Sequence, residues 1–151
     1  MQIRPYRDGD FHALYQLDQA CYPPGIAYSR SALRAFLAEP DAQAFVAEQE
    51  GRLIGFVLVA RQGRTLGHII TLDVDADHRR RGVGRTLLEH AERWLAAQGI
   101  ARVWLETAVD NEAAVAFWQK SGYRQRSVVP RYYLDRIDAY VMEKELERRL
   151  R

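Results

Sequence analysis

The spacing of apolar residues along the chain alternates between the period of a helix and the period of a strand. After a helix start at residues 8–10, Asp-Gly-Asp, apolar side chains recur at helical spacing from Phe11 to Leu17. Residues 21–29, CYPPGIAYS, hold two prolines and a glycine, which interrupt regular structure, and the final serine can cap a second helix that ends near Pro40. These patterns predict two helices joined by a loop.

The middle of the chain changes to short runs of β-branched and other apolar residues. Residues 44–47 and 53–60 flank a Glu50-Gly51 turn, and this arrangement predicts a β-hairpin. A third run, at residues 68–74, stops just before a cluster of arginines. The three runs predict three successive strands.

The last part of the chain returns to the helical period and then alternates. Apolar residues line one helical face from Val83 to Leu95, and Gly99 ends this helix as a C-terminal cap. The remaining elements are a strand at 101–109, a helix that begins at Asn111 and ends at Ser121-Gly122, and strands near 123–128 and 138–146. With one strand at the start of the chain, the order predicts an α/β domain with a mixed sheet. In that sheet the strand after the 83–95 helix runs parallel to the strand before it.

Composition and charge narrow the class of protein. The chain has 151 residues, 48% of them apolar, and no repeat or linker-like segment, which predicts one domain over residues 1–151. With 22 basic and 20 acidic residues there is no overall field that would favour nucleic acid. A single cysteine, four histidines at no metal-ligand spacing, and no run of about 18 apolar residues predict a cytoplasmic protein without a metal or a membrane span.

The arginine cluster lies at a predicted junction of strand and helix, DHRRRGVGRTLLEH at residues 77–90. Glycines at such a junction leave backbone N–H groups accessible at the positive end of a helix dipole, which is a site for an anion such as a pyrophosphate. A helix start decorated with solvated arginines explains the pattern equally well. The spacing is neither that of a dinucleotide fingerprint nor that of a nucleotide P-loop, and the absence of interleaved aromatic residues argues against nucleic acid.

Three segments resemble a known family. TLDVDADHRRRGVGRTLLEH (71–90) matches the Arg/Gln-x-x-Gly-x-Gly/Ala motif of the GNAT superfamily of acyl-CoA N-acyltransferases. WLETAVDNEAAVAFWQKSGY (104–123) and PRYYLDRIDAYVMEKEL (130–146) resemble protein N-terminal acetyltransferases of the bacterial RimI type, which acetylate a ribosomal protein, and their archaeal relatives. The resemblance implies a mixed, mostly antiparallel sheet of seven strands, splayed between the fourth and fifth strands and flanked by about four helices.

The resemblance also implies acetyl-CoA as the cofactor, bound along the splay. The residues implied to contact its pantetheine arm are Leu72, Asp73 and Val74 on the fourth strand, with Asn111, Ala114, Phe117 and Trp118 on the following helix. The residues implied to hold the pyrophosphate are Arg79, Arg80, Arg81, Gly82, Val83, Gly84, Arg85 and Thr86. Asn111 can also be explained as a helix N-cap, and the two roles are compatible.

Catalysis of acetyl transfer needs a neutral amine and a proton for the departing thiolate. Glu106 lies among apolar strand residues and matches the glutamate that acts as the base in RimI-like enzymes, although it could equally be a solvent-facing residue. Asp73 is a second carboxylate, with a role as amine binder or auxiliary base. Trp118 stands where many members of the superfamily carry an acidic tyrosine, and an indole cannot supply that proton. Tyr132 is therefore a candidate acid.

The residues expected around the acceptor amine are aromatic and apolar: Tyr22, Ile26 and Tyr28 from the 21–29 loop, with Tyr132 and Tyr133. The tyrosine pair could also simply pack a loop. The function implied is direct acetyl transfer to a primary amine, with the N-terminal α-amine of a protein or peptide as the expected acceptor, by a monomer or homodimer. The alternatives are a small-molecule or lysine acetyltransferase, or a catalytically weak acyl-CoA sensor. Cys21 is expected to pack rather than react.

Overall fold

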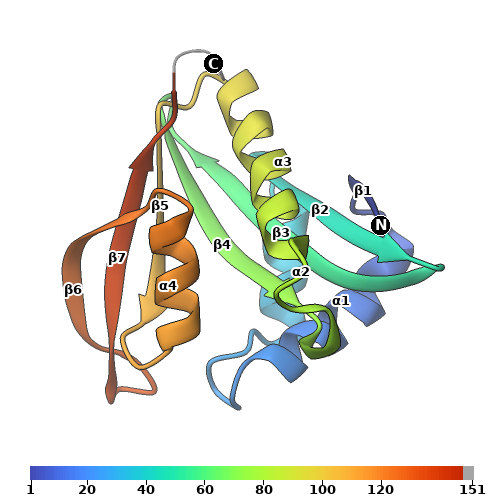
Figure 1. The fold of residues 1–151 in the computed structure, drawn as a ribbon, viewed down its shortest axis with the longest axis horizontal. Helices are drawn as coiled ribbons and strands as arrows, with labels where there is room; N and C mark the ends of the chain where they lie inside the picture. The colour runs from blue at the N-terminus through green and yellow to red at the C-terminus, as the bar shows by residue number, and fades with distance from the viewer. Residues whose placement is uncertain (148–151) are drawn as a thin grey trace.

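The computed structural model of the chain describes residues 1–147. Within them seven strands form one sheet in the order β1-β2-β3-β4-β5-β7-β6 (Figure 1). The strands are β1 (Gln2–Pro5), β2 (Ala42–Gln49), β3 (Arg52–Gln62), β4 (Leu66–Val74), β5 (Arg102–Ala108), β6 (Arg124–Tyr133) and β7 (Ile137–Glu145). All neighbours pair antiparallel except β4 and β5, which are parallel as predicted.

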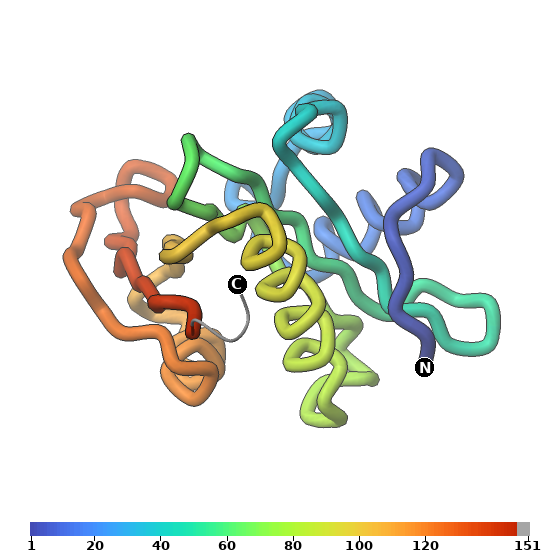
Figure 2. Tube along the Cα trace, turned by 90° about the horizontal axis from the view of Figure 1, so that it is seen from above, coloured from blue at the N-terminus to red at the C-terminus, as the bar shows by residue number. Residues whose placement is uncertain are grey.

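Four α-helices cover the two faces of the sheet. They are α1 (Phe11–Cys21), α2 (Arg30–Ala38), α3 (Val83–Ala97) and α4 (Glu112–Lys120), with short 3₁₀ turns at Asp8–Asp10 and Ala76–His78. Figure 2 shows α3 and α4 on one side of the sheet and α1 and α2 on the other. None of the helices in residues 1–147 is long and apolar enough to cross a bilayer. The predicted α/β order is confirmed, whereas residues 148–151 of the predicted domain lie outside the described residues.

Each face of the sheet buries its own apolar cluster. Leu87 and Leu95 of α3 pack with Val103 of β5 on one face, and all three are fully buried. On the other face Leu14 of α1 and Leu33 of α2 pack around β3 and are equally inaccessible. The apolar periodicity that predicted these helices is therefore the stripe that each helix presents to the sheet.

Strand β6 extends beyond its predicted end near residue 128 and reaches Tyr133. Pro130 lies inside it, and a proline removes one ladder hydrogen bond from a strand. β6 is the edge of the sheet and pairs only with β7, with a register shift between Val129 and Tyr133. An edge strand tolerates proline because one side of it has no ladder to complete.

The opening between β4 and β5 begins after three paired positions, Leu66 with Arg102, Gly67 with Val103 and His68 with Trp104. Beyond these pairs the two strands diverge (Figure 1). A β-bulge in β4 coincides with the divergence, because Val59 of β3 pairs with Ile69 while Leu58 pairs with Thr71, so that Ile70 is an extra residue. A bulge bends its strand, which turns the end of β4 away from β5. The predicted splay is confirmed.

A buried polar network ties α3 to the C-terminal part of the sheet. Glu92 is 5% exposed, and its carboxylate accepts hydrogen bonds from the Tyr123 hydroxyl at 2.7 Å and from Lys144 Nζ at 3.0 and 3.1 Å. The network joins α3, the segment before β6, and β7. A buried carboxylate satisfied in this way is costly to remove, because its partners lose their only strong acceptor.

Replacement of Glu92 by alanine is expected to lower the free energy of unfolding by about 3 kcal/mol, the cost of leaving a partly buried ammonium unpaired. Thermal or urea denaturation measures this change. Glu89→Ala is the matched control, because Glu89 lies on the same helix with a half-exposed side chain paired only to Arg85. That variant should change stability by less than about 0.5 kcal/mol. Equal losses in the two variants would show that the network contributes nothing.

Candidate active site

The backbone of β4 presents alternate residues to the gap. Asp75 N–H donates to the carbonyl of Ile54 on β3 at 2.8 Å, and hydrogen-bonded pairs alternate along an antiparallel ladder. The backbone groups of Asp73 therefore face β3, whereas those of Leu72 and Val74 face the opening. Of the three residues predicted to pair with a pantetheine arm, the register leaves Leu72 and Val74 available for it.

The N-terminus of α3 has the features of an anion site. Gly82, the N-cap residue, has a left-handed φ of 84°, and no side chain caps the helix. The N–H groups of the first three helical residues, 83–85, precede the first bond of the helical ladder, which Thr86 N–H makes to the Gly82 carbonyl at 3.0 Å. A Cβ atom at Gly84 would lie 3.4 Å from the Phe117 ring, so the glycine lets α4 approach. This uncapped terminus fits a pyrophosphate.

Arg79 does not extend toward that terminus. Its Nε atom donates to the Val74 carbonyl at 3.1 Å, and its Nη2 lies 3.7 Å from Cys21 Sγ. Burial raises the pKa of the Cys21 thiol to about 11, and the charge of Asp73 adds to the shift. Cys21 is therefore protonated at neutral pH and is no nucleophile, as expected for a packing residue.

Helix α4 begins with the cap expected from its sequence. The Asn111 side chain accepts a hydrogen bond from Ala114 N–H at 3.2 Å. Trp118 is only 7% exposed and packs edge-on against the rings of Phe117 and Tyr123, at 5.0 and 5.3 Å between centroids. The indole thus belongs to the core between α3, α4 and the sheet.

Glu106 lies at the apex of the opening and is paired with a histidine. Its Oε1 atom is 2.7 Å from His68 Nε2, and the two side chains are 10% and 15% exposed. The His68 ring stacks on Trp104, with 4.0 Å between centroids and 13° between planes. Glu106 is therefore not the solvent-facing strand residue that was considered as an alternative. The sequence did not indicate His68, because its partner Glu106 lies 38 positions away and the histidines show no local spacing typical of a site.

Three tyrosines lie close enough to the Glu106 carboxylate for its charge to act on them. Burial, and next the negative charge of Glu106, raise the pKa of Tyr28, Tyr132 and Tyr133 above the ordinary value of a phenol. The three hydroxyls thus stay protonated at neutral pH and can act as donors. Tyr132 and Tyr133 lie edge-to-face at 4.8 Å, and Tyr132 is 49% exposed. The structure brings together the predicted base and three of the predicted acceptor residues.

The 21–29 loop closes one side of this tyrosine cluster. The Tyr28 hydroxyl donates to the Ile70 carbonyl at 3.4 Å, and the Tyr22 hydroxyl donates to the Leu72 carbonyl at 3.3 Å. Gly25, with a φ of 88°, touches the Leu134 side chain at the turn between β6 and β7. Ile26 is half-buried in the same loop. The loop and the turn thus meet beside the cluster.

Asp73 lies apart from the tyrosine cluster. Its side chain is 1% exposed and accepts a hydrogen bond from Thr71 Oγ1 at 2.7 Å.

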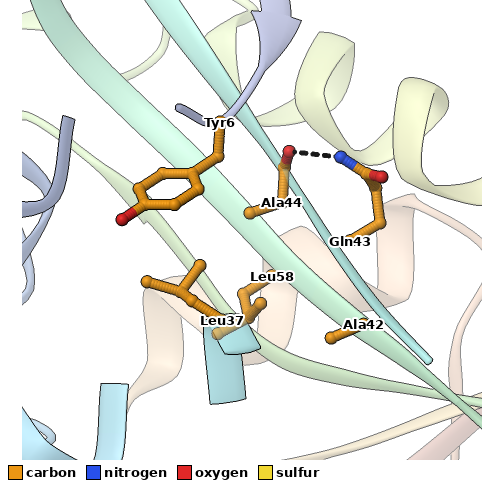
Figure 3. Close-up of a pocket in the computed structure, with 6 residues that line it drawn as sticks. All are labelled: Tyr6, Leu37, Ala42, Gln43, Ala44 and Leu58. Atoms are coloured by element: carbon orange, nitrogen blue, oxygen red, sulfur yellow. Dashed lines mark hydrogen bonds between the residues drawn. The ribbon is translucent and has the colours of Figure 1, made fainter. Parts of the chain in front are cut away.

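A separate pocket lies between α2 and β2, on the other side of β3 from the opening (Figure 3). It is lined by Tyr6, Leu37, Ala42, Gln43, Ala44 and Leu58, and Gln43 donates to the Ala44 carbonyl there at 2.9 Å. That lining offers no acid or base for chemistry at neutral pH.

Residues 11–123 match the Acetyltransferase (GNAT) family, and the chain belongs to this family. It is an acetyl-CoA-dependent N-acetyltransferase. The chain is 31% identical over 146 residues to an uncharacterized N-acetyltransferase of Methanocaldococcus jannaschii, covering 96% of this chain and 92% of that protein. It is 28% identical to the N-alpha-acetyltransferase of Sulfurisphaera tokodaii, covering 93% and 90%. The crystal structure of the ribosomal-protein-S18-alanine N-acetyltransferase from Escherichia coli matches with a TM-score of 0.86 and 26% identity, covering 97% and 94%.

Proposed function

We propose that this protein acetylates the N-terminal α-amine of a protein or peptide, with Glu106 as the base. The observation that carries the proposal is the Glu106–His68 pair, largely buried at the apex of the β4–β5 opening and ringed by protonated tyrosines. The similarity to an N-alpha-acetyltransferase and to a ribosomal-protein alanine acetyltransferase supports this acceptor class.

Acetyl-CoA supplies an activated acetyl group as a thioester. The main-chain N–H groups of Leu72 and Val74, on the open edge of β4, would hold its pantetheine arm, and the N–H groups at the start of α3 would hold its pyrophosphate. Arg80, Arg81 and Arg85 lie beside this terminus and add positive charge. These contacts direct the thioester end of the arm along β4 toward Glu106.

The side chains at the apex of the opening would then transfer the protons. The acceptor arrives mainly as an ammonium, and Glu106 takes one of its protons, directly or through a water molecule. The hydrogen bond from His68 fixes the orientation of the carboxylate. The amine nitrogen would form a bond to the acetyl carbon as the carbon–sulfur bond breaks. Tyr132 or water would give a proton to the thiolate and would be reprotonated by the second proton that the nitrogen loses. No acyl-enzyme forms, which agrees with the protonated state of Cys21.

The residues that surround the site favour the N-terminal amine of a peptide over a lysine side chain as the acceptor. Tyr22 and Tyr28 on one side and Tyr132 and Tyr133 on the other would contact the first residues of a peptide. Gly25 touches Leu134, so the loop and the β6–β7 turn meet on one side of the site, which favours an acceptor that enters end-on over a peptide that lies across the site. A free N-terminus can enter end-on, whereas a lysine within a chain brings flanking residues on both sides.

A peptide-library assay tests the acceptor class. We expect acetyl-CoA to be consumed with peptides that have a free N-terminus, with rates that depend on the first three residues. The same peptides with blocked N-termini and an internal lysine, and the polyamine spermidine, are the matched controls and should be inactive. Faster turnover with spermidine or the blocked peptides would assign the protein to the small-amine or lysine acetyltransferases instead.

A further inference from the structure

Two aspartates from separate elements meet in the interior beside β4. Asp18 of α1 is 0% exposed and Asp73 of β4 is 1% exposed, and the two carboxyl groups lie within hydrogen-bonding reach of each other. One oxygen of each carboxyl has a donor: Asp73 Oδ1 accepts from Thr71 Oγ1 at 2.7 Å, and Asp18 Oδ2 accepts from Tyr28 N–H at 2.9 Å. The contact thus links α1, β4 and the 21–29 loop.

The remaining oxygens define the chemistry of the contact. Asp18 Oδ1 and Asp73 Oδ2 are both fully buried, and within residues 1–147 no group donates a hydrogen bond to either atom. Two ionised carboxylates in contact away from water would repel each other without compensation. A single proton between them removes one charge and turns the contact into a hydrogen bond from a carboxylic acid to a carboxylate.

The pair lies where it can set the position of the acceptor wall. Asp18 accepts a hydrogen bond from the backbone N–H of Tyr28. Helix α1, which carries Asp18, ends at Cys21, just before Tyr22. The Tyr22 hydroxyl lies 3.5 Å from Thr71 Oγ1 and donates to the Leu72 carbonyl on the open edge of β4. If the carboxyl pair separated, the loop would lose one of its attachments to the strand, in addition to the hydroxyls of Tyr22 and Tyr28.

We propose that Asp18 and Asp73 are positioning residues that share one proton, and that this shared proton holds the 21–29 loop, with Tyr22 and Tyr28, against β4. The role assigned to the two tyrosines rests on the proposed function, whereas the shared proton does not. Asp73 then acts through the loop and has no contact with the acceptor. This replaces its predicted roles as amine binder or auxiliary base.

The pH dependence follows from the groups around the pair. Burial, and next Asp18, raise the pKa of Asp73 well above its usual range, while the hydrogen bond from Thr71 Oγ1 opposes the shift. The other titratable groups nearby are Cys21 and Tyr28, both protonated at neutral pH, and Arg79 contacts Cys21. Because the folded state binds this proton more tightly than the unfolded state, stability falls as the pH rises from about 4 through the raised pKa.

Asp73→Asn separates this proposal from a simple packing role. The amide keeps an acceptor for Thr71 and supplies a permanent N–H to Asp18 Oδ1, so it mimics the protonated acid. We expect the melting temperature of the wild type to fall between pH 5 and pH 9 relative to that of Asp73→Asn. We also expect the infrared difference spectrum between the two at pH 7 to contain the carbonyl band of one protonated carboxyl group. Asp41→Asn, at an exposed aspartate paired with Arg61, is the control and should show neither effect.

Kinetics with a synthetic peptide that begins with alanine tests the positioning role. Asp73→Ala leaves Asp18 Oδ1 without a hydrogen-bonding partner, so we expect the peptide KM to rise about tenfold, as for the loss of one buried hydrogen bond. The KM for acetyl-CoA should stay within about twofold, since the α3 terminus is untouched, and Asp73→Asn should recover most of the peptide KM. An unchanged peptide KM in Asp73→Ala would overturn the positioning role.

The infrared comparison of the wild type with Asp73→Asn remains decisive if Asp73→Ala fails to fold. Absence of the protonated-carboxyl band, together with the same pH dependence of melting in wild type and Asp73→Asn, overturns the shared proton. Neither measurement requires turnover. A protein that showed the band but acetylated no peptide would contradict the proposed acceptor and leave the shared proton established.

Discussion

Gly82→Asp is expected to abolish coenzyme A binding, with the fold retained. Gly82 is the N-cap residue of α3, beside the N–H groups proposed to hold the pyrophosphate. Its φ of 84° is accessible to aspartate and asparagine more readily than to other side chains, and a Cβ atom there meets nothing within 4 Å. The new carboxylate would cap the helix, occupy the N–H groups and repel the phosphates, so affinity should fall by about 100-fold or more.

Gly82→Asn is the matched control for that variant. The two side chains have the same shape and both cap helices, so they differ in charge alone. We expect Gly82→Asn to weaken binding less than Gly82→Asp, and both variants to melt within a few degrees of the wild type. Gly84→Glu places the same charge in the first turn of the helix, against Phe117, and should also abolish binding. Normal affinity for coenzyme A in Gly82→Asp and Gly84→Glu, measured by calorimetry, would refute the phosphate site.

Glu106→Gln is expected to reduce kcat by about 10²- to 10⁴-fold, the contribution of a general base. Glutamine is isosteric and can still bond His68, so the stack of His68 on Trp104 and the β4–β5 opening should remain. Affinity for coenzyme A should be unchanged, because Leu72, Val74 and the start of α3 are intact. Steady-state kinetics and calorimetry on the same preparation measure both quantities.

A second strand glutamate serves as the control for Glu106. Glu143 of β7 is 15% exposed at its side chain and forms an ion pair with Arg126 at 2.9 Å. Glu143→Gln should retain nearly full kcat, because it removes a carboxylate of similar burial outside the tyrosine cluster. If wild-type turnover is absent with every amine tested, the protein is an acyl-CoA sensor. If turnover survives in Glu106→Gln, the base is another group.

The elements of the fold could be predicted because their signals are local. The cap at Ser29, the glycine after α3 with its φ of 85° and the asparagine before α4 each lie within a few residues of the boundary that they set. The phosphate site is likewise a prediction from a local signal, because its glycines and arginines lie within a few consecutive residues. The end of β6 was mispredicted, because its tolerance for Pro130 depends on its place at the edge of the sheet.

The contacts that the sequence did not reveal join distant segments. His68 and Glu106 are 38 positions apart, and Asp18 and Asp73 are 55 apart. Their pairing depends on the register of β4 against β5 and on how α1 lies across the sheet. Neither can be read from the apolar periodicity of a single segment. The predicted parallel pairing of the two strands could have suggested His68 opposite the base, had the register been known.

The extra residue in β4 also changes which positions of the strand, odd-numbered or even-numbered, face each side of the sheet. Before Ile70 the odd-numbered positions, such as Ile69, face α3, and after it the even-numbered positions Leu72 and Val74 do so. His68 and Asp73, an even and an odd position, consequently lie on one face. Deleting a single residue here would exchange the two sides of the strand's end, so that a carboxyl would enter the apolar core and two hydrophobic side chains would meet the acceptor loop. The length of β4 can therefore change only in steps of two.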